Sequence, residues 1–278
     1  MNGSPAILTG WGRTAASAAK VVAIDDDTVA DAVAMAQKAS GRGALARGLG
    51  RSYGDAAQNG GGVVMRLAGV ADDVVIDDVA QTMRVGAGVG VDDLLRVIVP
   101  RGYFVPVTAG TRFITIGGAI ASDIHGKNHH REGSFGNHVR ELSLLLADGS
   151  VAVVSPTARP ELFWTTIGGM GLTGIVLDAT INLIPIETSR CIVDTIRADD
   201  LDEVMAAMED GDDRYRYAVA WIDLMAKGRH LGRSILAHGE HATLEQLGPK
   251  ERKAPLLYRA GIIADVPPVF PILSLIHI

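Results

Sequence analysis

The fold of this chain is decided by the stretch Ala46-Arg-Gly-Leu-Gly-Arg-Ser-Tyr-Gly-Asp55. Three glycines, two arginines, a serine and an aspartate follow an apolar run here, so consecutive backbone N–H groups could form a nest around an anion such as a pyrophosphate. The spacing of Gly48, Gly50 and Gly54 matches neither the G-x-G-x-x-G fingerprint nor the Walker lysine pattern. A nicotinamide Rossmann site and a P-loop NTPase are therefore disfavoured. A tight structural turn remains the alternative for this loop taken alone.

A second glycine-rich cluster lies further along the chain. Thr115-Ile-Gly-Gly118 predicts a helix over 115–122 capped by Thr115, where free backbone N–H groups would face an anion. Ser122-Asp-Ile-His-Gly-Lys-Asn-His-His130 adds hydroxyl and imidazole groups close by. Two such clusters favour a dinucleotide ligand. The adjacent His129 and His130 point in different directions in either regular structure, so we expect no metal site there.

Composition excludes several classes of protein. The 278 residues are 47% hydrophobic, which allows a large buried core. A formal charge of −6 disfavours a nucleic-acid binder, which would need a basic face. The single cysteine, Cys191, excludes an internal disulfide framework, and we expect it to be a small core residue. No apolar window reaches the roughly 18 residues of a spanning helix, and the N-terminus lacks the pattern of a signal peptide.

Periodicity and turn residues predict mixed α and β structure with a domain boundary near residue 188, separating 1–188 from 189–278. A repeat protein is not indicated, because no fixed period occurs. The predicted helices are Thr28–Ser40, Asp92–Val99, 115–122, Pro160–Thr166 and Asp200–Asp210. The predicted strands are 43–49, 62–67, 73–76, 82–87, Tyr103–Val107, Leu142–Ala147, Val151–Val154, Ile175–Ile186 and Tyr215–Ile222. Residues 272–278 form an apolar tail without turn or cap residues, which is typical of a truncated or read-through end.

Several of these motifs resemble those of the decaprenylphosphoryl-β-D-ribose 2-oxidase family of flavoproteins. The resemblance rests on Gly48–Asp55 with Gln58-Asn59-Gly60-Gly61, on Gly110–Gly118, and above all on residues 123–130 and 133–140. It covers about residues 7 to 270. It implies the α+β fold of the vanillyl-alcohol-oxidase superfamily, with a PCMH-type FAD-binding domain of two subdomains followed by part of an antiparallel substrate domain.

The resemblance also implies which residues hold FAD. Ala46 to Ala56 would cradle the pyrophosphate and adenosine side, a second segment would line the flavin, and Val176 would close over the adenine side. Relatives with covalent flavin carry a histidine where this chain has Asp55, so we expect non-covalent FAD. The expected cofactor-binding residues are Ala46, Arg47, Gly48, Leu49, Gly50, Arg51, Ser52, Tyr53, Gly54, Asp55, Ala56, Gly110, Thr111, Thr115, Ile116, Gly117, Gly118, Ser122, Asp123, Ile124, His125 and Val176.

Two residues are candidates for the chemistry, which needs a base for a ribose hydroxyl proton and cations for a lipid phosphate. His125 would contact the flavin or assist proton transfer, and Lys127 would meet the hydroxyl or the phosphate of the substrate. A hydrogen-bonded packing role is the alternative for His125. Gly126 and Lys127 are expected to bind substrate, together with Trp221, for which a core position is the alternative.

The family's function implies oxidation of the 2-hydroxyl of decaprenylphosphoryl-β-D-ribose to a 2-keto intermediate, the first half of its epimerisation to the arabinose donor for the actinobacterial cell wall. A separate NADH-dependent short-chain reductase would be the partner, and the location would be cytoplasmic or membrane-associated at the cell envelope. Family members continue beyond this chain, with an active-site cysteine, a tyrosine and a lysine near the flavin and substrate. Two alternatives are an aldonolactone or alditol oxidase, and an inactive fragment that acts as a flavin-binding or interaction module.

Overall fold

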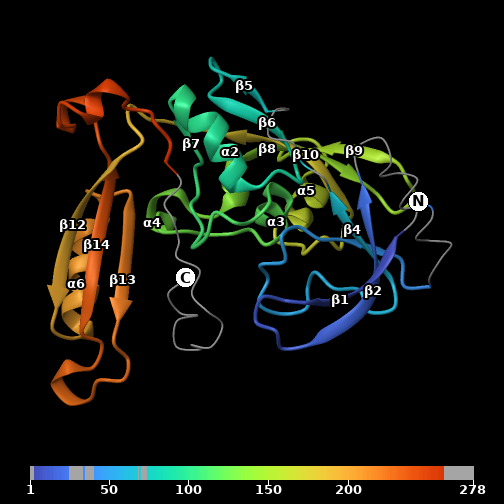
Figure 1. Ribbon diagram of the computed structural model, residues 1–278, viewed down its shortest axis with the longest axis horizontal. Helices are drawn as coiled ribbons and strands as arrows, with labels where there is room; N and C mark the ends of the chain where they lie inside the picture. The colour runs from blue at the N-terminus through green and yellow to red at the C-terminus, as the bar shows by residue number, and fades with distance from the viewer. Residues whose placement is uncertain (1–2, 25–33, 35–40, 68, 70–73, 260–278) are drawn as a thin grey trace. The chain divides into compact units, whose positions relative to one another are not determined.

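The computed structural model describes residues 3–24, 34, 41–67, 69 and 74–259 (Figure 1). The chain divides into two compact units. Unit 1 comprises Met1–Val97, Thr111–Ile124 and Phe135–Leu183, and unit 2 comprises Ile98–Gly110, His125–Ser134 and Ile184–Ile278. The predicted boundary near residue 188 lies close to the start of the last stretch of unit 2. The sequence did not indicate that two earlier stretches also join this unit.

The first sheet of unit 1 has the strand order β1-β2-β4-β3. Its strands are β1 (Ser4–Thr9), β2 (Ala16–Ile24), β3 (Ala44–Ala46) and β4 (Val63–Leu67). β1 pairs with β2 antiparallel, whereas β2 and β3 both pair with β4 in parallel. The short strand β3 therefore ends directly at Arg47, where the glycine-rich loop begins.

The second sheet of unit 1 is antiparallel, with the order β5-β6-β10-β8-β9. Its strands are β5 (Val75–Asp77), β6 (Thr82–Gly86), β8 (Val139–Leu145), β9 (Val151–Val154) and β10 (Ile175–Asn182). The predicted hairpin around Asp148-Gly149 is confirmed, as β8 pairs with β9. The single predicted strand Ile175–Ile186 is wrong. It ends at Asn182, and β11 (Ile184–Pro185) instead pairs with β7 (Tyr103–Phe104) in unit 2.

A shared hydrophobic core joins the two sheets of unit 1. Val22, Ile24, Val63 and Met65 from the first sheet pack with Leu145 and Ile175 from the second. Burial of such side chains is the main stabilising term of the unit, worth about 1.5–3 kcal/mol for each fully buried aliphatic side chain. The glycine-rich loop thus starts from a rigid base.

Short helices connect the strands of the second sheet. α3 (Ile116–Ala121) and α5 (Pro160–Thr166) confirm the predicted helices, the second with proline in its first turn. α2 (Val91–Ile98) continues as the 3₁₀ turn η2 (Val99–Arg101) and ends at Gly102, whose φ of +81° favours glycine. The 3₁₀ turn η3 (Phe135–His138) precedes β8.

Unit 2 is built on a three-stranded antiparallel sheet of order β12-β14-β13, with α6 along one face (Figure 1). These elements are β12 (Cys191–Ala198), α6 (Leu201–Gly211), β13 (Tyr217–Ile222) and β14 (Ser234–His241). Ala198, Val204 and Leu236 form the core under α6. Besides η2, β7 and β11, this unit contains α4 (His129–Glu132) and the 3₁₀ turns η4 (Gly228–His230), η5 (Leu244–Gln246) and η6 (Glu251–Lys253).

The predicted α+β class is confirmed, and one expectation about the core is wrong. Cys191 is exposed at the start of β12, because β12 is an edge strand whose face opposite α6 is open in the described part of the chain. Apart from residue 34, the predicted helix Thr28–Ser40 lies outside the described residues, as does the tail 272–278. Among the described helices, none has the length and apolar character needed to cross a membrane.

Candidate cofactor site

A cavity of about 470 Å³ lies in unit 1, where the two glycine-rich clusters meet. Three segments form its wall: the loop after β3, the start of α3, and the loop before β10. The lining residues are Ala46, Arg47, Gly48, Leu49, Gly50, Arg51, Ser52, Tyr53, Gly54, Ala56, Ala57, Leu67, Ala87, Gly88, Ile114, Thr115, Gly117, Gly118, Ala121, Ser122, Ile124, Met170, Gly171, Gly174 and Val176.

The loop 48–57 presents unpaired backbone donors along this cavity. The carbonyl groups of Ser52 and Tyr53 accept hydrogen bonds from Trp11 and Gly12, at 2.7 and 3.0 Å. By contrast, none of the backbone N–H groups of residues 48–57 donates to another residue in the described part of the chain. A row of unpaired N–H groups beside a cavity is the arrangement that binds an anion.

Arg47 closes this loop at its base. Its two terminal nitrogens donate to the carbonyl oxygens of Ala57 and Thr9, each at 2.7 Å. The residue is only 9% exposed, and its Nε atom is buried without a partner. Burial, and secondarily the charge of Arg66, lowers the pKa of Arg47 from its ordinary value. Within the described part of the chain no carboxylate forms an ion pair with this desolvated guanidinium, which favours an anionic ligand.

Two glycines allow close approach of backbone segments at the cavity: Gly48 between the two clusters, and Gly117 against Ala87. A Cβ atom at Gly48 would lie 2.3 Å from Oγ1 of Thr115, and one at Gly117 would lie 3.0 Å from Cβ of Ala87. Gly50 has a φ of +69°, which an ordinary side chain rarely adopts. The glycines of both clusters therefore serve close approach of backbone segments as well as loop geometry.

The expectation of free N–H groups at the start of α3 is wrong. The amides of Ile116 and Gly117 donate to the carbonyls of Val89 and Ala87, at 3.0 and 2.8 Å. The amide of Gly118 donates to Oγ1 of Thr115 at 3.1 Å, which confirms Thr115 as the helix cap. Because these amides are already paired, the unpaired donors of the site come from the first loop.

Most predicted cofactor-binding residues lie on the cavity wall. The predicted residues outside the wall are Asp55, Gly110, Thr111, Ile116, Asp123 and His125. Ile116 is fully buried in the core, and the Asp123 side chain accepts a hydrogen bond from the amide of Gly136. Sequence reasoning missed the wall residues Ala57, Leu67, Ala87, Gly88, Ile114, Ala121, Met170, Gly171 and Gly174. Of these, only the glycine-rich segments 86–90 and 168–174 carried a signal, their high glycine content.

The candidate catalytic residues His125 and Lys127 belong to unit 2. The Lys127 amide donates to the Thr108 carbonyl at 3.3 Å, and its own carbonyl accepts from the Ala218 amide at 2.8 Å. A Cβ atom at Gly126 would overlap the Thr108 carbonyl, so this close approach requires glycine. Desolvation lowers the pKa of Lys127. The His125 ring is exposed and stands edge-on to His129, with ring centres 5.4 Å apart.

Trp221 lies on the face of the β12-β14-β13 sheet opposite α6. It pairs with Ile235, while the neighbouring pair Ala220 and Leu236 packs toward α6. Alternation along the strand therefore turns Trp221 to the other face, where it is 53% exposed. The alternative of a core tryptophan is wrong for the chain as described. No group of three or more metal-binding side chains gathers among the described residues.

The chain belongs to a family of FAD-binding domains. Residues 17–155, half of the chain, match the family described as FAD binding domain. This match includes the glycine-rich loop, α3 and the segment 123–140. The unpaired donors of the loop, the buried Arg47 cation and the glycine-lined cavity fit the pyrophosphate of a dinucleotide. The cofactor is FAD.

Three relatives indicate the kind of protein to which this domain belongs. The decaprenylphosphoryl-β-D-ribose oxidase of Mycolicibacterium smegmatis is 46% identical over 95% of this chain and 58% of that protein. An alditol oxidase from a Streptomyces species is 32% identical over 64% of this chain and 42% of its own. Cytokinin dehydrogenase 4 of Arabidopsis thaliana is 32% identical over 50% of this chain and 27% of its own. The chain thus spans only about three fifths or less of each relative's length.

Proposed function

We propose that this chain is the FAD-binding part of an oxidase that converts the 2-hydroxyl of decaprenylphosphoryl-β-D-ribose to a ketone. This reaction is the first half of the epimerisation that leads to decaprenylphosphoryl arabinose for the cell-wall arabinan. The main support is the 46% identity to the Mycolicibacterium oxidase over 95% of the chain, which includes both units. The Streptomyces alditol oxidase and the Arabidopsis cytokinin dehydrogenase match 64% and 50% of the chain.

The observation that carries the proposal is the cavity of unit 1 with its unpaired N–H donors and the buried Arg47. Residues 48–57 would bind the pyrophosphate of FAD, and Val176 with the loop 168–174 would lie along the rest of the dinucleotide. Bound FAD supplies the acceptor for the hydride that leaves C2 of the ribose. The side chains of the protein then have to bind the substrate and receive the hydroxyl proton.

Lys127 and His125 are the residues that we assign to these tasks. The desolvated ammonium of Lys127 has no ion-pair partner among the described residues, so a substrate phosphate or hydroxyl can occupy its donors. The exposed imidazole of His125 lies two residues away and can serve as the acceptor of the hydroxyl proton. Trp221 offers an exposed aromatic surface for the ribose or its lipid.

We propose that FAD is held without a covalent bond. Asp55 stands at the end of the loop where covalently flavinylated relatives carry a histidine. Its carboxylate is exposed, and its carbonyl accepts a hydrogen bond from the Gln58 amide at 2.9 Å. Denaturation with acid should therefore release all flavin into solution. Flavin that stays with the precipitated protein would contradict this assignment.

The substrate can be identified by following reduction of the bound flavin in the absence of oxygen. The purified FAD-loaded protein is mixed with a polyprenylphosphoryl ribose, with free ribose and with an alditol, and the flavin absorbance is followed. Bleaching by the lipid-linked ribose alone supports the proposal. Bleaching by the alditol instead would favour a soluble-sugar oxidase, in line with the alditol oxidase of the Streptomyces species. No bleaching by any of the three would leave a flavin-binding module.

The proposed product implies a partner. A 2-keto sugar becomes an arabinose epimer only when a reductase delivers hydride to the opposite face of C2. We therefore propose an NADH-dependent short-chain reductase as the partner, and contact with a membrane through the lipid of the substrate. Conversion of the ribose to the arabinose epimer should require both proteins together, and conversion by this chain alone would contradict a separate partner.

A further inference from the structure

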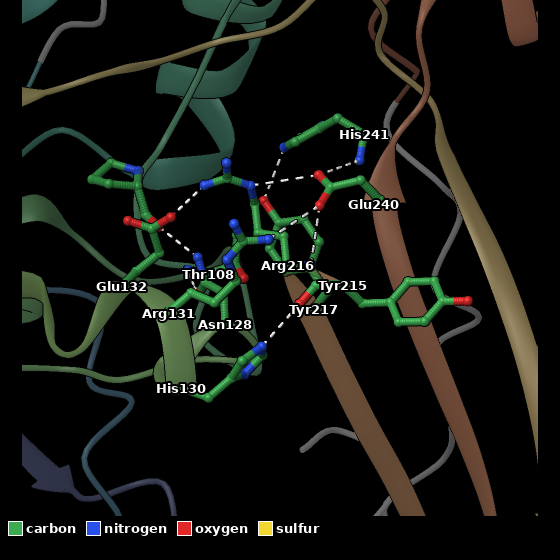
Figure 2. A network of polar contacts seen from close by, with 11 residues as sticks. Thr108, Asn128, His130, Arg131, Glu132, Tyr215, Arg216, Tyr217, Glu240 and His241 are labelled. Carbon is green, nitrogen blue, oxygen red and sulfur yellow. Dashed lines mark hydrogen bonds and ion pairs between the residues drawn. The ribbon is translucent and has the colours of Figure 1, made fainter. Parts of the chain in front are cut away.

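The side chains of Arg216, Glu132 and Glu240 form a charged cluster within unit 2 that the proposed function does not use (Figure 2). Arg216 directly precedes β13, Glu132 ends α4 and Glu240 lies near the end of β14. The Arg216 guanidinium forms an ion pair with Glu132 through Nη1, and its Nε lies 3.5 Å from Oε1 of Glu240. Arg216 and Glu132 are about one fifth exposed, at 22% and 19% of their side chains. A pair this buried is screened little by solvent.

Two hydrogen bonds also join the segment 127–132 to residues 215–218, and one more ion pair joins it to β14. The Ala218 amide donates to the Lys127 carbonyl at 2.8 Å, and Nε2 of His130 lies 2.9 Å from the Tyr215 carbonyl. Arg131 adds an ion pair with Glu240 at 3.7 Å. Figure 2 shows the side chains of α4 directed at the start of β13. The segment 127–132 is therefore bound to residues 215–218 at both of its ends, by Lys127 at one end and by Glu132 at the other.

The opposite side of Lys127 is fixed by a buried amide. Asn128 is fully buried, and its Nδ2 donates to the Pro106 carbonyl at 2.6 Å. Its side chain does not cap α4, although Asn128 is the cap residue. Lys127 is thus held between the loop 106–108 and β13, and the ion pair holds the other end of the segment.

From this geometry we infer that Arg216, through Glu132, is a positioning residue for Lys127. It holds α4 against β13, so the backbone of Lys127 stays bonded to Ala218 and its ammonium stays half-buried at one place. The inference rests on the proposed function only in that Lys127 is the residue that meets the substrate. Loss of the ion pair would leave the carboxylate of Glu132 partly buried with one partner fewer, which favours release of α4 from the strand.

The test uses the full chain and reads the amine of Lys127 itself. Competitive labelling with acetic anhydride across pH, with quantification of the Lys127 peptide by mass spectrometry, gives the midpoint of its titration. The exposed Lys250 serves as an internal reference for the reagent. In Arg216→Met we expect the Lys127 midpoint to move to higher pH, because the amine gains water. Hydrogen exchange of the Ala218 amide should accelerate by about tenfold or more, as its bond to Lys127 opens.

The matched control is Arg233→Met, at the other end of the same sheet. Arg233 directly precedes β14 and pairs with Asp223 at 2.8 Å, with its side chain 58% exposed. This variant removes the same charge and should leave the Lys127 midpoint and the Ala218 exchange unchanged. Arg216→Lys, which keeps the charge, should restore part of the wild-type midpoint.

A purely structural role predicts a different outcome. Arg216→Met would then lower the melting temperature and leave the Lys127 midpoint unchanged, which would overturn the inference. Should Arg216→Met fail to fold, Glu132→Gln removes the same ion pair from the other side, and an unchanged midpoint there would overturn it equally. The readout does not depend on oxidation. If the Lys127 midpoint shifts but the chain oxidises no lipid-linked ribose, the proposed function is contradicted. The positioning role of Arg216 is then still supported.

Discussion

A methyl group at Gly48 would meet the hydroxyl of Thr115, because the Cβ position lies 2.3 Å from Oγ1. Gly48→Ala should therefore push the first loop away from α3 and disturb its cap. We expect a loss of stability of about 1–3 kcal/mol, as for other overpacked sites, and weaker FAD binding. Thermal melts and a flavin fluorescence titration measure both effects.

The control for this substitution is Gly41→Ala. A Cβ atom at Gly41 would have no atom within 4 Å, so the melting temperature and FAD affinity should stay at wild-type values. Equal FAD affinity in Gly48→Ala and Gly41→Ala would show that the contact between the two glycine clusters does not shape the cofactor site.

His238 on β14 should make unit 2 sensitive to acid. The residue is 1% exposed, and both ring nitrogens lack a hydrogen-bond partner among the described residues. Burial, followed by the charge of Arg214, lowers its pKa. Since the unfolded chain takes up the proton near pH 6.5 and the folded chain only at lower pH, the free energy of unfolding should fall as pH drops below about 7.

His238→Leu should flatten this dependence, as measured by urea unfolding between pH 5 and 8 in about half-unit steps. His129→Leu removes an exposed imidazole and should keep the wild-type slope. A His238→Leu protein that loses stability with acid as steeply as the wild type would show that other groups govern the response.

At the scale of elements, α6 depends on its cap. Oδ1 of Asp200 accepts from the Glu203 amide at 2.9 Å, and Glu203 in turn accepts from the Asp199 amide at 2.6 Å. Asp200→Ala should therefore lower the free energy of unfolding by about 1 kcal/mol, whereas Asp200→Asn should keep most of it. Urea unfolding measures both changes. Asp213→Ala, an exposed substitution beyond the end of the helix, should change the free energy of unfolding little. Equal stability of Asp200→Ala and Asp213→Ala would contradict the cap.

Elements with strong local signals were predictable from the sequence. The cap residues Thr115 and Asp200, the hairpin turn Asp148-Gly149 and the helix-initiating Pro160 each fix a boundary through their own chemistry, and the structure confirms all four elements. β1, β2, β12 and β14 were missed. β12 pairs with β14, which lies far along the chain, so no local pattern specifies this pairing, whereas β1 and β2 form a local hairpin that the sequence interpretation overlooked. The predicted strand 175–186 was too long because apolar alternation continues past Asn182. Beyond that residue, however, the chain pairs with β7 in a different sheet.

The candidate site shows the same division. The first loop could be predicted from its own sequence, because closely spaced glycines and arginines are typical of an anion-binding loop. Ala57, Ala87 and Ile114 line the cavity without any distinctive sequence, since only tertiary packing brings them there. Free donors were predicted both in the first loop and at the start of α3, and within the described residues only those of the first loop are unpaired. The backbone amides at the start of α3 instead donate to the carbonyl groups of Val89 and Ala87.

For the whole molecule, the cofactor cavity and the candidate catalytic residues come from different compact units. Every residue of the cavity wall belongs to unit 1, whereas His125 and Lys127 belong to unit 2. Lys127→Met should therefore leave FAD affinity within about twofold of the wild type. The free energy of unfolding should change by no more than about 0.5 kcal/mol. A large loss of FAD affinity in this variant would place Lys127 among the cofactor ligands.

The loop 48–57 binds the pyrophosphate of FAD if its unpaired backbone donors act as the cofactor site requires. The direct measurement is a calorimetric titration of the flavin-free chain with FAD, FMN and riboflavin. Because the unpaired N–H groups and Arg47 act on a diphosphate that only FAD carries, FAD should bind at least about tenfold more tightly than FMN, and riboflavin more weakly still. Equal affinities for the three flavins, or no binding of FAD, would contradict the claim.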